Sequence, residues 1–175
     1  MDRAPPPCLI VFSGLPGTGK TTVSKALAAE LRAPYLRIDS VEQAMRAAGL
    51  GDIGPAGYAV ANALAKANLR LGQSVVADCV NPVRASRAGW SAVAARAPAV
   101  LVNIHLVCSD PVEHRRRVEG RVADIPGHVL PGWDAELRHG FEVWEEDHLR
   151  LDTAAASPAR LLELCRRHVV LRQAA

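Results

Sequence analysis

The sequence predicts a three-layer α/β fold in which a parallel sheet lies between two layers of helices. Short apolar runs such as Cys8–Phe12 and Val75–Ala77 alternate along the chain with longer segments of helical periodicity. An apolar run without polar alternation is typical of a parallel strand that is covered on both faces. A glycine-rich stretch, Gly14–Gly19, directly follows the first run. Because ligands bind such folds at the carboxyl ends of the strands, we expect the functional residues at that edge.

The strands and helices can be placed in order along the chain. The apolar runs predict the strands, which are 8–12, 35–38, 75–79, 100–107 and about 149–152. Helical periodicity predicts the helices, which are about 20–32, 41–48, 56–71, 82–95, 111–122, 134–146 and 158–170. Ser40 and Ser109-Asp110-Pro111 can cap the helices that follow them, and Ser157-Pro158 is expected to start the last helix. Asn81-Pro82 is expected to start the helix after the third strand.

The composition is that of one ordered domain, residues 1–175. Hydrophobic residues make up 49% and charged residues 22% of the sequence, which excludes a disordered chain. No stretch approaches the ~18 consecutive apolar residues of a membrane span. The apolar run before Ser13 is too short for the core of a secretory signal. We therefore expect a cytoplasmic protein with no membrane partner.

Cysteines, histidines and charge exclude further classes of protein. The four cysteines form no CxxC pair, so reduced and buried thiols are expected. The six histidines show no zinc-binding spacing, so no structural metal is expected. With a net charge of only +3 and few aromatic residues, nucleic acid is not expected as a partner. The expected partner is a small molecule, and the protein is expected to be a monomer or a homodimer.

The segment Gly14–Thr21 has the sequence GLPGTGKT and matches the phosphate-binding pattern GxxxxGK[ST] at every required position. It lies between an apolar strand and a helix, which is the context that the pattern needs. Glycines let backbone amides surround a phosphate, and the helix N-terminus adds partial positive charge. Lys20 can reach the β- and γ-phosphates, and the Thr21 hydroxyl can bind Mg²⁺. The residues expected to bind ATP are Gly14, Pro16, Gly17, Thr18, Gly19, Lys20, Thr21 and Thr22.

Other motifs separate the classes of P-loop protein. A GTPase usually carries an N/T-K-x-D motif for guanine, and neither Lys25 nor Lys66 fits it. Motor ATPases need a longer chain with sensor residues or arginine fingers. On these residues the chain resembles the small P-loop kinases, such as adenylate, gluconate and shikimate kinases, and most closely the AAA_33-type bacterial kinases. The resemblance covers roughly residues 8–170. It implies five parallel strands in the order 2-3-1-4-5, Mg-ATP as cofactor and a lid that closes over ATP.

Asp39 follows the second predicted strand, 19 residues after Lys20. The resemblance to chloramphenicol phosphotransferase-like kinases implies that an aspartate here takes the proton from the acceptor hydroxyl. Asp39 could instead only cap the helix that follows it. Relatives often have Asp-x-x-Arg at this point, whereas this chain has Glu42, with Arg46 one turn later. Glu42 and Arg46 are therefore expected near the acceptor, and the charge of the acceptor stays open.

Asp78 ends an apolar run that is similar to a Walker B strand. It could hold Mg²⁺ through a water molecule, or it could contact the acceptor and be the base in place of Asp39. It could also merely bond to loop amides. Asn81 and Arg84 follow Asp78 at the carboxyl edge of the predicted sheet, and both are candidates for acceptor binding.

Arg117 and Arg121 lie four residues apart, just before a loop rich in glycine and proline. In adenylate kinase-like enzymes, arginines with this spacing flank the lid. The resemblance implies that Arg117 stacks on adenine, that Arg121 reaches the phosphates, and that the lid is approximately 122–134. A guanidinium suits both roles because it is planar and always charged. The alternative is a solvated helix face, which is expected for Arg115 and Arg116.

The sequence therefore predicts an ATP-dependent kinase that transfers the γ-phosphate of Mg-ATP to a hydroxyl of a small molecule. The expected catalytic residues are Lys20, Asp39 and Arg121, and the expected metal ligands are Thr21 and Asp78.

Two alternatives stay open. A nucleoside monophosphate kinase would need several arginines around the acceptor, and only Arg46, Arg84 and Arg87 are available. An ATP-binding regulatory module would consume little ATP with any acceptor.

Overall fold

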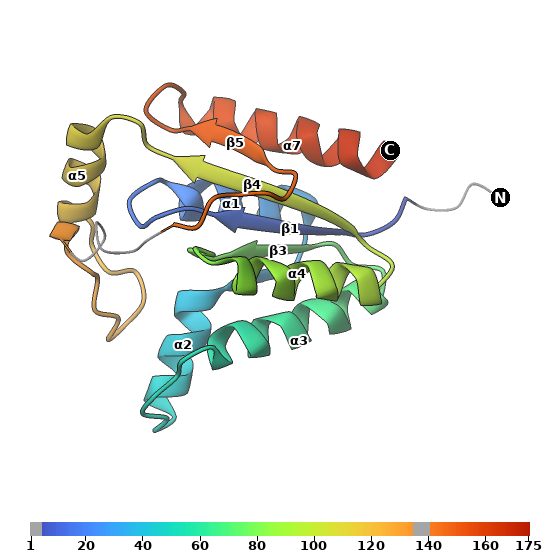
Figure 1. The fold of residues 1–175 in the computed structure, drawn as a ribbon, viewed down its shortest axis with the longest axis horizontal. Helices are drawn as coiled ribbons and strands as arrows, with labels where there is room; N and C mark the ends of the chain where they lie inside the picture. The colour runs from blue at the N-terminus through green and yellow to red at the C-terminus, as the bar shows by residue number, and fades with distance from the viewer. Residues whose placement is uncertain (1–4, 135–140) are drawn as a thin grey trace.

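The computed structural model describes residues 5–134 and 141–175 and shows an α/β protein with one parallel sheet (Figure 1). The five strands lie in the order β2-β3-β1-β4-β5, so the predicted fold is confirmed. The strands are β1 (Cys8–Ser13), β2 (Tyr35–Arg37), β3 (Val75–Asp78), β4 (Val100–Val107) and β5 (Leu149–Asp152). The helices of the described residues are α1 (Lys20–Leu31), α2 (Ile38–Ala47), α3 (Ala56–Arg70), α4 (Arg84–Arg96), α5 (Pro111–Glu119) and α7 (Pro158–Ala174).

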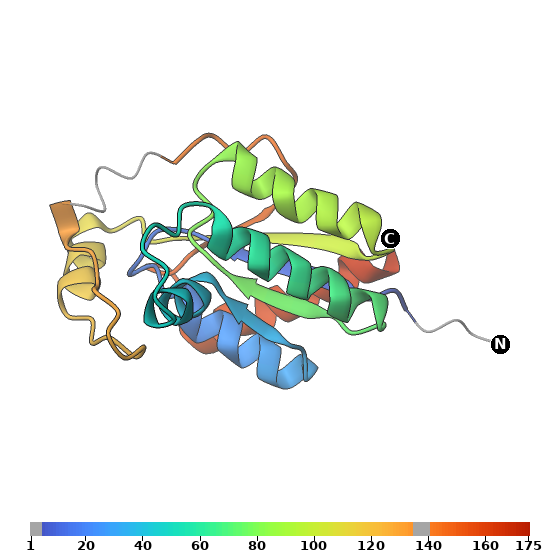
Figure 2. The same cartoon turned by 90° about the horizontal axis from the view of Figure 1, so that it is seen from below.

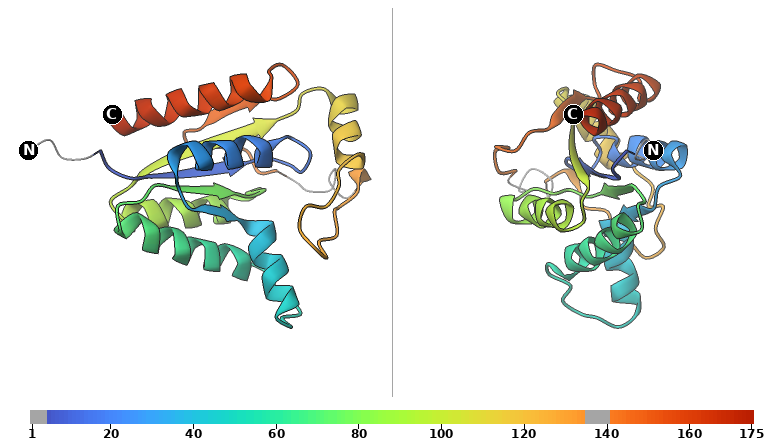
Figure 3. Two further views of the ribbon diagram at one scale, coloured as in Figure 1. Left: turned by 180° about the vertical axis from the view of Figure 1, so that it is seen from behind. Right: turned by 90° about the vertical axis from the view of Figure 1, so that its right-hand side faces the viewer.

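Helices cover both faces of the sheet, as Figures 2 and 3 show. α1 and α7 lie on one face, where Val23 and Leu161 pack against the sheet. α3 and α4 lie on the other face, where Ala61 and Trp90 pack. All five residues of Cys8–Phe12 are fully buried, because β1 is central and covered on both sides. Among the described residues, no helix has the length and apolar character needed to cross a membrane.

The carboxyl ends of β1, β2 and β3 lie side by side at one edge of the sheet. Phe12 pairs with Asp78, and Asp78 pairs with Arg37, in parallel register. The glycine-rich loop leaves β1 at this edge, and Asp39 follows Arg37 there. The topology thus brings together three segments that carry the predicted site residues.

α2 begins earlier than the sequence predicts. Asp39 and Ser40 lie in its first turn, and the N-cap position belongs to Arg37, which makes no side-chain cap. The interpretations of Ser40 and of Asp39 as caps are therefore wrong. β2 is an edge strand of only three residues, and the chain enters the helix as soon as its pairing with β3 ends. The partial positive charge of the helix N-terminus favours a carboxylate such as that of Asp39.

α4 begins later than predicted. The sequence places its start at Asn81-Pro82, whereas the N-cap is Val83 and Arg84 is the first helical residue. Asn81 adopts a φ of 55°, which turns the chain between β3 and α4 and delays the helix. An asparagine tolerates this left-handed conformation better than most residues.

α5 ends earlier than predicted, at Glu119, with Gly120 at the C-cap. Arg121 therefore lies beyond the helix and not on it. Asp110 accepts two backbone N–H groups at the start of α5, and Ser157 accepts one at the start of α7. The predicted cap at Asp110 and the predicted start of the last helix at Ser157-Pro158 are confirmed.

The predicted helix 134–146 is wrong over residues 141–146, which are irregular, while residues 135–140 lie outside the described residues. Arg87 of α4 holds this irregular segment. Its guanidinium donates to the Val143 carbonyl at 3.1 Å and pairs with Glu146 at 3.0 Å. It also lies 4.8 Å from the centre of the Trp144 ring. Tertiary contacts to a buried arginine thus replace the helical hydrogen bonds of this segment.

The irregular segment also buries His105 of β4, which stacks on Phe141 at 5.0 Å and on Trp144 at 5.5 Å between ring centres. Burial, together with the charges of His148 and Arg150, lowers the pKa of His105 to about 4. Because the unfolded chain takes up this proton near pH 6.5, the free energy of unfolding is expected to fall as the pH drops from about 6.5 towards 4.

Urea unfolding at pH 7 and pH 5 measures this effect. The variant His105→Phe, which keeps a ring for stacking, should lose less stability between the two pH values than the wild type. A smaller dependence should remain because burial also lowers the pKa of His168. The same pH dependence in both proteins would contradict the prediction.

Candidate active site

The loop between β1 and α1 needs glycine at its turning points. Gly14, Gly17 and Gly19 have φ values of 143°, 79° and 82°, which other residues rarely adopt. A Cβ atom at Gly14 would lie 2.2 Å from the carbonyl oxygen of Leu106. Because backbone cannot yield at that distance, the close approach of this loop to β4 depends on glycine.

Contacts within the loop and from α5 hold the shape of the loop. The Lys20 ammonium and the Thr18 hydroxyl both donate to the Leu15 carbonyl, at 3.0 and 2.7 Å. Both side chains belong to residues that are almost fully buried. His114 of α5 bonds through Nε2 to the carbonyl of Pro16 at 2.8 Å. The loop is thus preorganised, and the Lys20 side chain is held against the loop backbone.

Thr21 and Asp78 are in direct contact at the start of α1. The Thr21 hydroxyl donates to Asp78 Oδ2 at 2.8 Å, and the Tyr35 hydroxyl donates to the same oxygen at 2.6 Å. Asp78 is only 3% exposed. Burial and the neighbouring Asp78 raise the pKa of Tyr35 above its ordinary value, so Tyr35 stays a proton donor in this contact. Sequence reasoning missed Tyr35, whose only signal is its position at the start of β2 beside β3.

The Thr21–Asp78 pair fits an Mg²⁺ ion that is shared with a nucleotide. A hydroxyl and a carboxylate are the hard oxygen ligands that Mg²⁺ prefers, and Mg²⁺ in such sites is completed by water and phosphate oxygens. No group of three His, Cys, Asp or Glu side chains suited to hold a metal occurs within residues 5–134 and 141–175. The donor set therefore suits a cation that arrives with phosphate and not a metal bound by protein alone.

Asp39 lies at the same edge as Asp78, one strand further out. Its side chain is 39% exposed, and Arg37 Nε donates to its Oδ2 at 3.3 Å. Arg37 is opposite Asp78 in the register of β2 and β3. The structure thus brings the two candidate carboxylates to the ends of neighbouring strands, with Arg37 next to both. Arg37 carries no motif, and sequence reasoning missed it.

The remaining acceptor candidates are occupied by contacts within the chain. Arg46 pairs with Glu42 at 3.2 Å on the surface of α2. Arg84, which is largely exposed, pairs with Glu145. Asn81 is fully buried, and its amide group donates to the Ser13 hydroxyl at 2.9 Å. Asn81 therefore ties the end of β3 to the end of β1 beneath the glycine-rich loop.

Arg117 lies on α5, and its side chain extends to Thr153, the residue after β5. Its guanidinium bonds to Glu113 at 2.7 Å and to the hydroxyl and the carbonyl of Thr153 at 2.8 and 3.2 Å. The Thr153 methyl group lies 4.0 Å from the place where a Cβ of Gly19 would be. Arg117 is thus anchored beside the end of the loop at which α1 begins.

Arg121 lies at the base of the predicted lid. It donates to the carbonyls of Val118 and Pro131, at 3.2 and 2.7 Å. These bonds join the two ends of the segment between α5 and Trp133. In the structure Arg121 therefore closes the lid segment into a loop.

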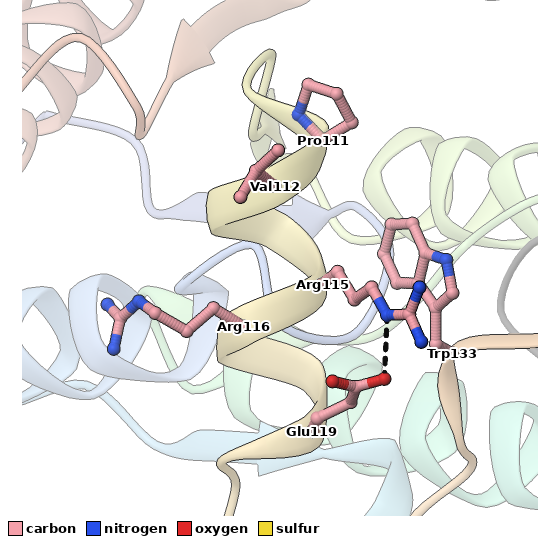
Figure 4. A pocket seen from close by; sticks show the side chains of 6 residues that line it. All are labelled: Pro111, Val112, Arg115, Arg116, Glu119 and Trp133. Atoms are coloured by element: carbon pink, nitrogen blue, oxygen red, sulfur yellow. Dashed lines mark hydrogen bonds and ion pairs between the residues drawn. The ribbon is translucent and has the colours of Figure 1, made fainter.

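The outward face of α5 is separate from the glycine-rich loop. A hollow of about 560 Å³ lies there. Figure 4 shows the side chains that line it, which are Pro111, Val112, Arg115, Arg116, Glu119 and Trp133. Arg115 pairs with Glu119, and Arg116 pairs with Glu113, as expected of a solvated face. A smaller cavity, of about 300 Å³, borders the loop itself at Leu15 and Thr18.

Residues 9–138 match the sequence profile of AAA_33, a family of AAA domains. The chain belongs to the AAA_33 family. This finding confirms the family resemblance seen in the sequence. No curated protein matches the AAA_33 chain closely enough to count as a relative.

Solved structures of kinases are similar to this AAA_33 chain over nearly its whole length. A candidate kinase from Chloroflexus aurantiacus J-10-fl is 26% identical, with a TM-score of 0.74, and the match covers 93% of this chain and 98% of that one. A sugar kinase from Janibacter sp. HTCC2649 is 21% identical, with a TM-score of 0.71 and coverage of 97% and 98%. The APS kinase of Mycobacterium tuberculosis, in complex with AMPPNP and APS, is 20% identical, with a TM-score of 0.66 and coverage of 95% and 99%. At the lower identities the likeness shows a shared fold alone.

Proposed function

We propose that this AAA_33 protein is an Mg-ATP-dependent phosphotransferase that acts on a hydroxyl group of a small molecule. The observation that carries the proposal is the direct bond between Thr21 and Asp78 at the same sheet edge as Asp39. A metal-binding pair beside a phosphate loop, with a half-exposed carboxylate one strand away, suits transfer from a nucleotide to a hydroxyl.

Each of these residues would have a distinct role in the transfer. Backbone amides of Gly17–Thr21 hold the phosphates, and Lys20 neutralises charge that spreads over the transferring group. Thr21 and Asp78 would hold Mg²⁺, which supplies further charge neutralisation when bound. Asp39 accepts the proton of the acceptor hydroxyl as the new O–P bond forms and the bond to the ADP oxygen breaks.

A nucleoside monophosphate kinase is the weaker alternative. A phosphate acceptor needs arginines that are available to it, because paired guanidinium groups must first give up their partners. In the described part of the chain, Arg46 pairs with Glu42, and Arg84 and Arg87 pair with Glu145 and Glu146. Arg87 is buried in its pair, whereas Arg46 and Arg84 form exposed pairs that break at little cost. At most two of the three arginines are thus available to a phosphate acceptor, which favours a hydroxyl acceptor.

A panel of hydroxylated metabolites tests the proposal. Sugars, sugar acids, nucleosides and antibiotics are incubated singly with the protein and Mg-ATP, and ATP consumption is compared with that of the protein alone. We expect at least one compound to raise ATP consumption well above the rate without acceptor. If only monophosphates do so, the monophosphate kinase alternative replaces the proposal. Binding of ATP with no stimulated consumption supports a regulatory module instead.

Replacement of Arg117 and of Arg121 by alanine is expected to give different kinetic effects. If Arg117 stacks on adenine, its loss should raise KM for ATP by roughly 2- to 30-fold and leave kcat nearly unchanged. Arg121 ties the lid ends together, so its loss should lower kcat about tenfold with little effect on KM. Steady-state kinetics with the acceptor found in the panel measure both effects.

Arg116→Ala is the matched control, because Arg116 lies on the outward face of the same helix. It should leave both constants unchanged. Equal and negligible effects of all three substitutions would show that neither Arg117 nor Arg121 contributes to ATP binding or turnover.

A further inference from the structure

Four charged residues from distant parts of the chain meet at the end of β2. Arg37 Nη1 lies 2.8 Å from both carboxylate oxygens of Asp124, and Arg37 Nε bonds to Asp39 at 3.3 Å. Lys25 of α1 bonds to Asp124 at 3.0 Å. Asp124 belongs to the predicted lid, 122–134, so this cluster joins the lid to the elements that carry the candidate base.

The burial of these residues is unequal. The Arg37 side chain is only 10% exposed, whereas Asp39, Asp124 and Lys25 are 39%, 47% and 50% exposed. Burial alone would lower the pKa of Arg37, but its bond to Asp124 and the charges of Asp39 and Asp78 raise it. Bonds from Arg37 and Lys25 lower the pKa of Asp124 to about 2. A buried guanidinium that lost both carboxylates would be costly to keep, because its charge would have no partner.

The lid also touches α2 directly. A Cβ atom at Gly127 would lie 2.8 Å from the side-chain nitrogen of Gln43. The described lid residues 122–132 contain no helix or strand, so their position depends on contacts with the body of the protein. The lid therefore lies against the end of β2 and against α2, the helix whose first turn contains Asp39.

We propose that Arg37 is a positioning residue that couples the candidate base to the lid. Its Nε orients Asp39, and its Nη1 holds Asp124 so that the lid stays closed over the acceptor side. A planar guanidinium carries N–H donors on different sides, so it can bond to Asp39 and to Asp124 at once. The compact ammonium group of a lysine lacks this fixed arrangement of donors. The inference rests on the proposed function, because it takes Asp39 as the base and 122–134 as the lid.

Hydrogen exchange of the backbone amide of His128, which bonds to the Ile125 carbonyl within the lid at 3.1 Å, tests the contact with the lid in the full chain. Arg37→Gln and Asp124→Asn should each raise exchange about five- to tenfold, as expected when a charged bond to a buried partner is lost. The double variant should exchange no faster than the faster single variant, because both remove the same bond. Asp124 is half-exposed, so Asp124→Asn should fold normally even if Arg37→Gln does not.

Two further variants separate geometry from charge. Lys25→Gln removes the exposed partner of Asp124 and should change exchange by less than about twofold. Arg37→Lys keeps the charge but lacks the planar group, so it should exchange nearly as fast as Arg37→Gln. Exchange within twofold of the wild type in both Arg37→Gln and Asp124→Asn would overturn the role of Arg37 in holding the lid.

Hydrolysis of Mg-ATP in the absence of an acceptor tests the effect on Asp39. Asp124→Asn releases only the lid and admits water, so hydrolysis should rise roughly two- to fivefold. Arg37→Gln releases the lid and Asp39 together, so hydrolysis should stay at or below the wild-type rate. Equal rises in both variants would show that Arg37 acts on the lid alone and would overturn its role in positioning the base.

A calorimetric titration with Mg-AMPPNP separates this inference from the proposed function. If the lid responds as expected but the wild-type protein binds no Mg-AMPPNP, the link between Arg37 and the lid stands and the kinase assignment fails. If Mg-AMPPNP binds and the lid does not respond, the inference fails and the kinase assignment stands.

Discussion

Replacing Lys20 by alanine is expected to lower phosphoryl transfer by about 10²–10³-fold, the loss that follows removal of one charge-stabilising group in a preorganised site. Lys20 is the first residue of α1, and its ammonium lies within the glycine-rich loop, bonded to the Leu15 carbonyl. The remaining loop contacts, from Thr18 and His114, do not involve its side chain. The fold should therefore survive the substitution. ATP consumption with the acceptor from the metabolite panel measures the effect, and circular dichroism checks folding.

Lys66→Ala is the matched control, because Lys66 lies on α3, away from the loop. It should retain wild-type turnover. Near-normal turnover of a well-folded Lys20→Ala variant would exclude the P-loop kinase mechanism.

Replacing Asp39 by asparagine is expected to lower turnover by about 10²–10⁴-fold, the usual contribution of a positioned general base. The amide keeps the size of the side chain and an oxygen that can still accept the bond from Arg37 Nε. Because Asp39 does not cap α2, stability should change little. The variant loses the ability to accept a proton, so kcat should fall while KM for ATP stays nearly constant.

Asp78→Asn is the matched control for the base. It removes one carboxylate charge beside Thr21. Turnover should therefore respond less steeply to Mg²⁺ concentration, and the affinity for Mg-AMPPNP should fall. If Asp39→Asn keeps full turnover while Asp78→Asn abolishes it with unaltered Mg²⁺ dependence, Asp78 is the base. If both variants keep full turnover, no carboxylate deprotonates the acceptor and the monophosphate kinase alternative becomes the better explanation.

The glycine-rich loop could be predicted from sequence because its pattern is local. Gly14–Thr21 lies in one continuous stretch, and the positive φ values of its glycines follow from the loop itself. Asp78 could be assigned because parallel topology brings strand ends to one edge, and β1 and β3 are adjacent. The alternation of apolar runs with helical periodicity also predicted the five strands, because burial along each segment determines its own pattern of apolar residues.

The contacts made by Arg37 and Tyr35 at this sheet edge could not be predicted in this way. Arg37 and Tyr35 belong to no motif, and they gain their roles from Asp124 and Asp78, which are 87 and 43 residues away in sequence.

Local patterns also misplaced some helices. The segment 141–146 has helical periodicity, but its Glu142 and Val143 carbonyls accept bonds from Arg87. α2 starts at Ile38 because the edge strand β2 is short.

The sequence by itself thus determined the fold class, the phosphate loop and the candidate carboxylates, since each depends on neighbouring residues or on strand order. Only the tertiary structure decided which charges are paired. A salt bridge between distant residues forms from the packing of elements and leaves no periodic trace in the sequence.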